Sequence, residues 1–84
     1  MSYRVLVDYQ VIQLMDRLPP ARRRLLQNFF IRLQSFSNSL VDYHEYDGEK
    51  QRIEISLVGR YAVKFWIDHL ARHIKVLEVT LADQ

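Results

Sequence analysis

The sequence predicts an α+β fold in which a helix hairpin packs on one face of a twisted, mainly antiparallel sheet of four or five strands. Residues 52–68 alternate apolar and polar side chains on both sides of Val58-Gly59-Arg60, as two half-buried antiparallel strands do. Residues 21–37 instead repeat apolar side chains at three- and four-residue steps, which is the period of an amphipathic helix. Because the helical segments precede a run of strands, the order favours α+β over alternating α/β.

The other elements follow from local signals in chain order. Asp8 suits a helix N-cap, since its carboxylate can accept from free backbone donors of the first turn. Pro19-Pro20 ends that helix and can begin the next one. Asp47-Gly48 is a turn signal between strands. The expected elements are strands at 3–7, 42–47 and 73–81, a helix at 9–17 and a second helix from about 21 to 37.

Length and composition limit the class of protein. The 84 residues make one domain, residues 1–84, and 49% hydrophobic with 26% charged residues is ordinary globular composition. The chain has no cysteine, which excludes disulfides, thiolate zinc sites and a cysteine nucleophile, and fits a reducing cytoplasm. No apolar run approaches the ~20 residues of a membrane span, so a membrane partner is not expected. We expect no cofactor and no metal, because the spacing of His44, His69 and His73 matches no metal motif.

Strand register determines which residues share a face of the sheet. A three-residue connection between the two central strands places the apolar residues of both strands on one face of the sheet. A loop with an odd number of residues before the last strand places the apolar residues of that strand on the same face. The predicted register sets Leu57 opposite Tyr61 on the inward face at the turn. The predicted outer-face pairs are then Glu54 with Lys64, Arg52 with Trp66 and Lys64 with Glu78. The predicted core centre is Leu25, Phe29, Phe30, Leu33, Ile53, Ile55, Val63, Phe65 and Leu77.

Two features suggest a binding surface. Arg22, Arg23 and Arg24 lie in the first turn of the second helix, where the helix dipole disfavours cations by about 0.3–1 kcal/mol each. Three arginines there suggest an acidic protein or an RNA as partner, although a solvated basic turn is the simpler interpretation. Trp66 beside Arg52 is suited either to stacking a base or to anchoring a partner helix, and we favour the partner helix.

The combination of motifs resembles the RelE/ParE superfamily of toxins from type II toxin–antitoxin systems, which includes plasmid-stabilisation proteins. The resemblance rests on Gly59-Arg-Tyr-Ala-Val-Lys-Phe-Trp66, on Ile74-Lys-Val-Leu-Glu-Val79 and on the Leu18-Pro19 corner before a basic helix. It implies a RelE-like fold and a cytoplasmic, toxin-type protein that a cognate antitoxin binds and neutralises. Members of the superfamily include ribosome-dependent mRNA endonucleases, gyrase poisons and proteins without demonstrated toxicity, and the chain could also form a homodimer.

Whether this chain is an enzyme stays open at the level of sequence. The superfamily often has an arginine after the hairpin tyrosine, where this chain has Ala62, and its nucleases often carry arginine, histidine or tyrosine near the C-terminus, where residues 80–84 have none. Arg52, Arg60 and Lys64 are the candidate catalytic cations of a metal-independent endoribonuclease. The alternative is a non-enzymatic interaction module. The departures favour it, as does the expected pairing of Lys64 with two glutamates.

Overall fold

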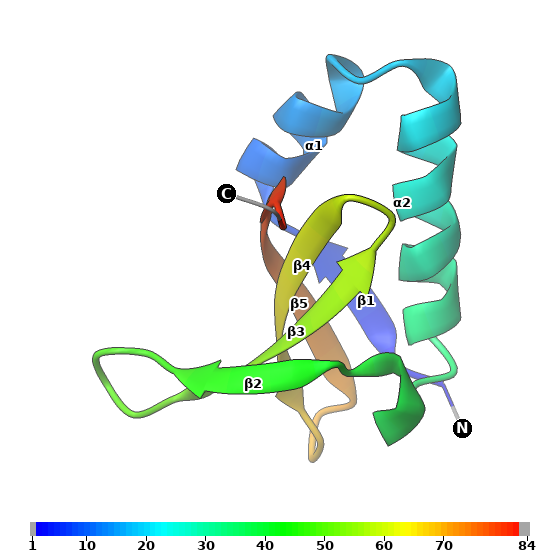
Figure 1. Cartoon of the computed structure of the whole chain (residues 1–84). Coiled ribbons are helices and arrows are strands. Elements are labelled where there is room, and N and C mark those ends of the chain that lie inside the picture. The colour runs from blue at the N-terminus through cyan, green and yellow to red at the C-terminus, as the bar shows by residue number, and fades with distance from the viewer. Residues whose placement is uncertain (1, 83–84) are drawn as a thin grey trace.

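The computed structural model describes residues 2–82. Its five strands form one sheet of order β1-β5-β4-β3-β2, in which β1 is parallel to β5 and every other neighbouring pair is antiparallel (Figure 1). The α+β prediction is therefore confirmed. The elements are β1 (Arg4–Val7), α1 (Tyr9–Asp16), α2 (Pro20–Leu33), the short 3₁₀ helix η1 (Asn38–Leu40), β2 (Tyr43–Tyr46), β3 (Arg52–Val58), β4 (Tyr61–Asp68) and β5 (His73–Leu81).

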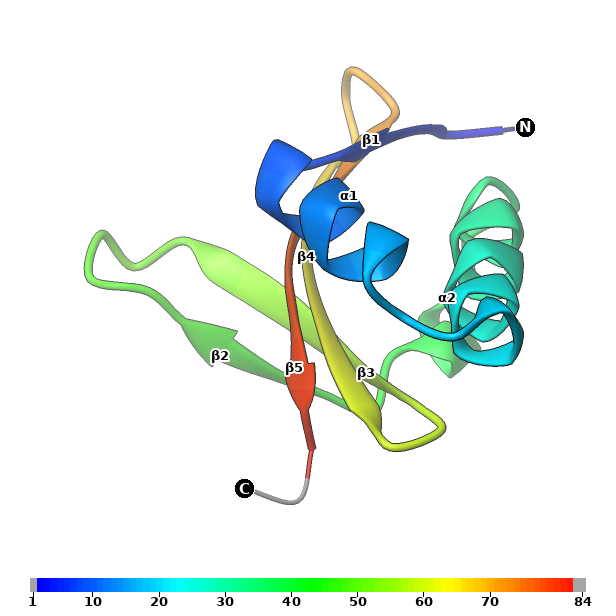
Figure 2. The same cartoon turned by 90° about the horizontal axis from the view of Figure 1, so that it is seen from above.

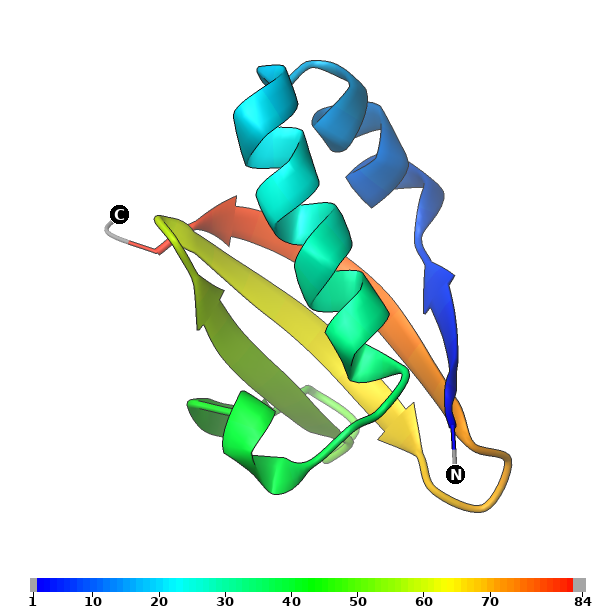
Figure 3. The same cartoon turned by 90° about the vertical axis from the view of Figure 1, so that its right-hand side faces the viewer.

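Both helices lie on one face of the sheet, and α2 crosses in front of the central strands (Figures 2 and 3). Phe65 lies at the centre of the core, is fully buried, and meets the rings of Phe29 and Phe36 edge-on at centroid distances of 6.2 and 6.4 Å. Burying large aromatic side chains supplies much of the stability of so small a domain. The buried cluster is Val11, Met15, Leu26, Phe29, Phe30, Leu33, Val58, Tyr61, Val63, Phe65, Ile74, Val76 and Val79.

Side chains satisfy backbone groups at both ends of α1. The Asp8 carboxylate accepts a hydrogen bond from the Gln10 backbone N–H at 2.9 Å, as the sequence predicts. Arg23 reaches back from α2 and donates to the backbone carbonyls of Met15 at 3.1 Å and Leu18 at 3.0 Å. A cation on the last carbonyls of a helix is favourable, because that end of the helix dipole is negative.

The predicted register of the β3–β4 hairpin is wrong by one residue. Val58, not Leu57, lies opposite Tyr61, and the connection is the two-residue turn Gly59-Arg60. Gly59 has φ +60°. A positive φ at the first turn residue alone is typical of a type II′ turn, whose twist matches that of the flanking strands. The shift by one residue exchanges the faces of β3, so Glu54 and Ser56 point toward the helices while Ile53, Ile55 and Leu57 point away from them.

The β4–β5 hairpin has the expected register only in its part farther from the loop, and the loop does not have the odd length that was predicted. Its loop spans four residues, from His69 to Arg72, and a bulge in β5 between the partners of Lys64 and Phe65 then corrects the alignment. On the C-terminal side of the bulge in β5, Glu78 lies opposite Lys64 as predicted. On its N-terminal side, Val76 pairs with Phe65, and so Val76 rather than Leu77 enters the core.

These two registers decide which predicted core residues are confirmed. Five belong to the buried cluster: Phe29, Phe30, Leu33, Val63 and Phe65. Leu25 is 42% exposed and Leu77 is half-buried, so both predictions are wrong. Ile53 and Ile55 are buried but lie outside that cluster, on the face away from the helices. The second helix also ends at Leu33 rather than Ser37.

Candidate functional site

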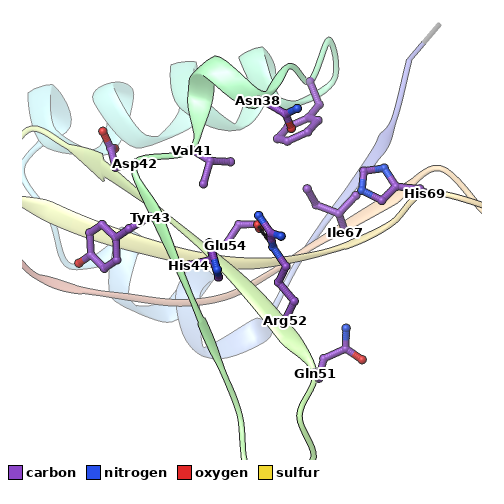
Figure 4. A pocket seen from close by; sticks show the side chains of 11 residues that line it. Asn38, Val41, Asp42, Tyr43, His44, Gln51, Arg52, Glu54, Ile67 and His69 are labelled. Carbon is purple, nitrogen blue, oxygen red and sulfur yellow. Dashed lines mark hydrogen bonds and ion pairs between the residues drawn. The ribbon is translucent and has the colours of Figure 1, made fainter.

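A hollow with a volume of about 640 Å³ lies on the helix side of the sheet, beside η1 (Figure 4). This volume falls within the ~300–1,000 Å³ typical of ligand sites. The hollow forms because α2 stops at Leu33 and leaves this end of β2 and β3 without a helix above it. Its lining residues are Phe36, Asn38, Val41, Asp42, Tyr43, His44, Gln51, Arg52, Glu54, Ile67 and His69.

A partly buried ion pair joins the floor of this hollow to its rim. The Arg52 Nε donates to both carboxylate oxygens of Glu54, at 2.7 and 3.1 Å. The Glu54 side chain is 8% exposed and that of Arg52 is 56% exposed, so the guanidinium lies at the rim. A buried carboxylate requires such a partner, because removing a charge from water is costly. The charge of Arg52 is therefore largely neutralised within the protein, and His44 lies directly opposite Glu54 on β2.

His69 lies across the hollow and is positioned by the N-terminal segment. The Tyr3 hydroxyl is 3.1 Å from His69 Nδ1, and the two rings meet edge-on. Arg72 lies over the Tyr3 ring at 5.5 Å from its centroid, in cation–π geometry. The hollow thus collects imidazole, carboxylate and guanidinium groups. Among residues 2–82 there is no group of three or more histidine or carboxylate side chains suited to hold a metal ion.

Lys64 lies on the opposite face of the sheet. Its Nζ is 2.9 Å from Glu45 Oε1 and 3.8 Å from Glu78 Oε2. The prediction that two glutamates flank this lysine holds, but Glu45 of β2 takes the place assigned to Glu54, which the corrected register turns to the helix side. The hydrogen bond to Glu45 and the charge of Glu78 raise the pKa of Lys64 above its usual 10.5, despite the opposing effect of burial.

The structure does not bring the three candidate catalytic cations together. Arg52 lies on the helix side, Lys64 on the outer face, and Arg60 in the exposed β3–β4 turn. The predicted pairing of Arg52 with Trp66 is wrong for the same reason, because Trp66 lies on the outer face opposite Lys75. A phosphate bound to one of these cations would be out of reach of the others on the far side of the sheet.

The three arginines at the start of α2 have different environments. Arg22 and Arg24 are exposed. Arg23 is half-buried, and its two hydrogen bonds to the α1–α2 corner give it a structural role.

The hollow, the Arg52–Glu54 pair and the contact with Glu45 were not predicted from the sequence. A glycine at the first position of a two-residue turn was the signal that would have given the correct register.

Comparisons with known proteins identify the fold. No protein-family model and no curated protein matches the sequence significantly. Among solved structures, RelE in the archaeal RelE–RelB complex from Pyrococcus horikoshii matches with a TM-score of 0.82 and 22% identity, over 100% of this chain and 99% of that one. The toxin–antitoxin complex RelBE2 from Mycobacterium tuberculosis matches with a TM-score of 0.81 and 16% identity, over 96% and 99%.

A double arginine-to-alanine mutant of the E. coli toxin RelE in the free state also matches, with a TM-score of 0.71 and 13% identity over 99% of this chain and 86% of that one. Three independent structures of this kind show that the chain has the RelE toxin fold over its whole length. The RelE-like topology predicted from the sequence is therefore confirmed. Within the described residues, no helix combines the length and hydropathy needed to cross a membrane.

Proposed function

We propose that this chain is the toxin-type component of a type II toxin–antitoxin system, and that a cognate antitoxin binds and neutralises it. The observation that carries the proposal is the full-length match to two toxins solved as toxin–antitoxin complexes. The surface supports it, since Leu25, Ile31, Tyr43 and Leu57 are all more than 40% exposed. Apolar surface of this kind on a small domain favours burial against a protein partner.

We further propose that binding, rather than RNA cleavage on the outer sheet face, is the main activity. Cleavage of a phosphodiester requires cations directed at the developing negative charge. On this face Lys64 is already paired with Glu45 and Glu78, whose carboxylates would repel a phosphate. The neighbouring outward residues Ile55 and Ala62 are apolar and buried. These features support an interaction module that keeps the RelE fold.

Expression of the chain with and without the protein encoded by the adjacent reading frame tests the proposal in cells. We expect the two proteins to co-purify, and we expect the second protein to relieve any growth arrest that the first one causes. Growth arrest with normal translation would instead favour a target such as gyrase. If the adjacent product neither binds nor protects, the toxin–antitoxin assignment is wrong.

Metal-independent RNA cleavage is the second candidate function, because the hollow brings His44, Arg52, Glu54 and His69 to one place. Imidazole and carboxylate groups can transfer protons, and a guanidinium can stabilise a phosphate. The Arg52–Glu54 pair opposes this candidate, since it neutralises the cation. Ribosomes loaded with mRNA and incubated with wild type, Arg52→Met or Lys64→Met distinguish the sites. We expect little or no cleavage by any of them, and loss of a robust wild-type cleavage in one variant would locate the active site.

A further inference from the structure

The strand β2 forms an open edge of the sheet. In the sheet that residues 2–82 build, β2 has a neighbour on one side only, namely β3. All of its residues are exposed, and Figures 1 and 2 show β2 and the turn after it projecting to one side of the body, away from both helices. An edge of this kind can pair with a strand of another molecule, because its outward backbone groups are left unpaired.

The ladder between β2 and β3 determines which backbone groups point to the open edge. The Asp47 N–H donates to the Gln51 carbonyl at 3.0 Å and continues this ladder in register. Hydrogen-bonded and non-hydrogen-bonded pairs alternate along an antiparallel ladder, so Glu45 directs its N–H and carbonyl groups toward β3. The N–H and carbonyl groups of His44 and Tyr46 therefore point away from β3, to the edge.

The strand carries little of the protection that sheet edges usually have. Its sequence, Tyr-His-Glu-Tyr, contains no proline and no lysine, which are residues that often block an edge. Its one charge is the Glu45 carboxylate, whose Oε1 lies 2.9 Å from Lys64 Nζ of the same chain and is thereby compensated. The strand is short, which limits how tightly it can pair but does not prevent pairing.

One arrangement of two β2 strands uses all of these edge groups. A two-fold axis that passes between the two Glu45 residues sets His44 of each copy opposite Tyr46 of the other copy. Both of these become hydrogen-bonded pairs, in which each residue donates its N–H group and accepts at its carbonyl group. An axis at His44 or at Tyr46 would instead leave the other residue without a matching pair. The edge of β2 is therefore complementary to itself in one register.

The side chains fit the same arrangement. His44 lies opposite Glu54 and so, like Tyr46, projects to the helix side, where the two rings of one chain meet edge-on at 5.7 Å. The second copy adds its Tyr46 ring beside His44, and aromatic cross-strand pairs stabilise a sheet. Because His44 lines the hollow, this ring also extends the rim of the hollow. The two Glu45 carboxylates meet on the other face, where Lys64 of each chain offsets their repulsion.

We propose that β2 pairs antiparallel with β2 of a second copy of this chain and joins the two sheets into one. This inference does not depend on the proposed function. A second copy is favoured over an unrelated strand, because the edge groups and the aromatic rings of β2 complement themselves. Two four-residue strands are too short to bury the ~1,200–2,000 Å² of a stable interface, so we expect a weak dimer with a Kd between about 10 μM and 1 mM.

Sedimentation equilibrium of the purified chain at concentrations up to about 1 mM tests this dimer. Tyr46→Pro removes an N–H group that the monomer does not use and should weaken dimerisation by roughly tenfold or more. The matched control Tyr46→Phe keeps both the ring and the N–H group and should dimerise like wild type. Thermal unfolding shows whether the monomer of each variant is folded.

A charge series at the dimer axis gives a second readout. Lys64→Met leaves the two Glu45 carboxylates uncompensated and should weaken dimerisation by about threefold, and adding Glu45→Gln should restore it. A loss of dimer that Glu45→Gln does not restore would contradict the axis at Glu45.

NMR of a mixture of differently labelled copies checks the register directly. The Cα atoms of the two Glu45 residues should lie about 4.5 Å apart, as in a non-hydrogen-bonded pair, so we expect a contact between their Hα atoms. A chain that stays monomeric at the highest concentration would overturn the proposal. So would a dimer that Tyr46→Pro leaves intact, since the two copies would then meet elsewhere. Pairing of β2 with the product of the adjacent reading frame, and not with a second copy, would also overturn it.

Discussion

Replacing Gly59 with alanine tests the turn between β3 and β4. A residue other than glycine at φ +60° in a type II′ turn is strained by about 1–3 kcal/mol. The new methyl group would also lie 2.7 Å from Leu25 Cδ2, which is too close for two carbon atoms. Leu25 is partly exposed and its side chain can move aside, so this contact adds less than the backbone strain does. We therefore expect Gly59→Ala to lower the free energy of unfolding by about 1–3 kcal/mol.

Urea unfolding of Gly59→Ala, Leu25→Ala and the double variant separates the two contributions. The clash requires both side chains, so the double variant should lose less stability than the sum of the single variants. The backbone strain should remain in the double variant. A Gly59→Ala protein as stable as wild type would contradict the type II′ turn and, with it, the register of β3 against β4.

Three further predictions concern the core, the helix corner and the outer face. Phe65→Ala removes a fully buried ring and should cost about 3–5 kcal/mol in urea unfolding, which is a large part of the stability of a small domain at the lower end of the ~5–15 kcal/mol range. Arg23→Gln should lower stability by about 1–3 kcal/mol through the loss of two hydrogen bonds to backbone carbonyls, whereas exposed Arg22→Gln should change it little. The pKa of Lys64 is raised in the folded state, so the charge of Lys64 contributes fully to the free energy of unfolding below pH 10.5. This contribution is lost as the pH rises through the higher folded-state pKa. The difference in stability between wild type and Lys64→Met should therefore shrink only above about pH 10.5.

Each of these predictions has a clear contrary result. A cooperative Phe65→Ala protein with near-parent stability would contradict the packing of α2 on the sheet. Equal effects of the two glutamine substitutions would contradict the structural role of Arg23. A difference between wild type and Lys64→Met that grows above pH 10.5 would contradict the contact with Glu45. Below that pH the difference should not exceed about 1 kcal/mol, because partly exposed ion pairs contribute little.

The sequence predicted the order of elements and the class of fold because these depend on local signals. Alternation in β3 and β4, the proline corner and the cap at Asp8 each act within a few residues. The faces of β3 were predicted the wrong way round, because the apolar residues of the strand alternate with polar ones on the face that turns inward. Ile53, Ile55 and Leu57 suggest one inward face, but Val58 enters the core, and the turn at Gly59 decides between the two.

The candidate site depends on contacts that the sequence pattern does not contain. Glu54 and Ser56 can face inward only because Arg52 pairs with Glu54 and because the Ser56 hydroxyl donates to the Leu40 carbonyl. Such partners become visible only when β3 and η1 are placed in space. The basic turn was recognised as a cluster, yet the separate role of Arg23 follows from the approach of α1 to α2. The bulge in β5 likewise has no local signature such as a glycine.

Size-exclusion chromatography with light scattering tests the proposed partnership most directly. The purified chain and the purified product of the adjacent reading frame are run alone and then as a mixture at moderate salt. We predict a single complex of defined stoichiometry in the mixture, whose affinity falls with ionic strength because exposed charges contribute to binding. Elution of the two proteins at their separate masses, at low as well as moderate salt, would contradict the toxin–antitoxin assignment.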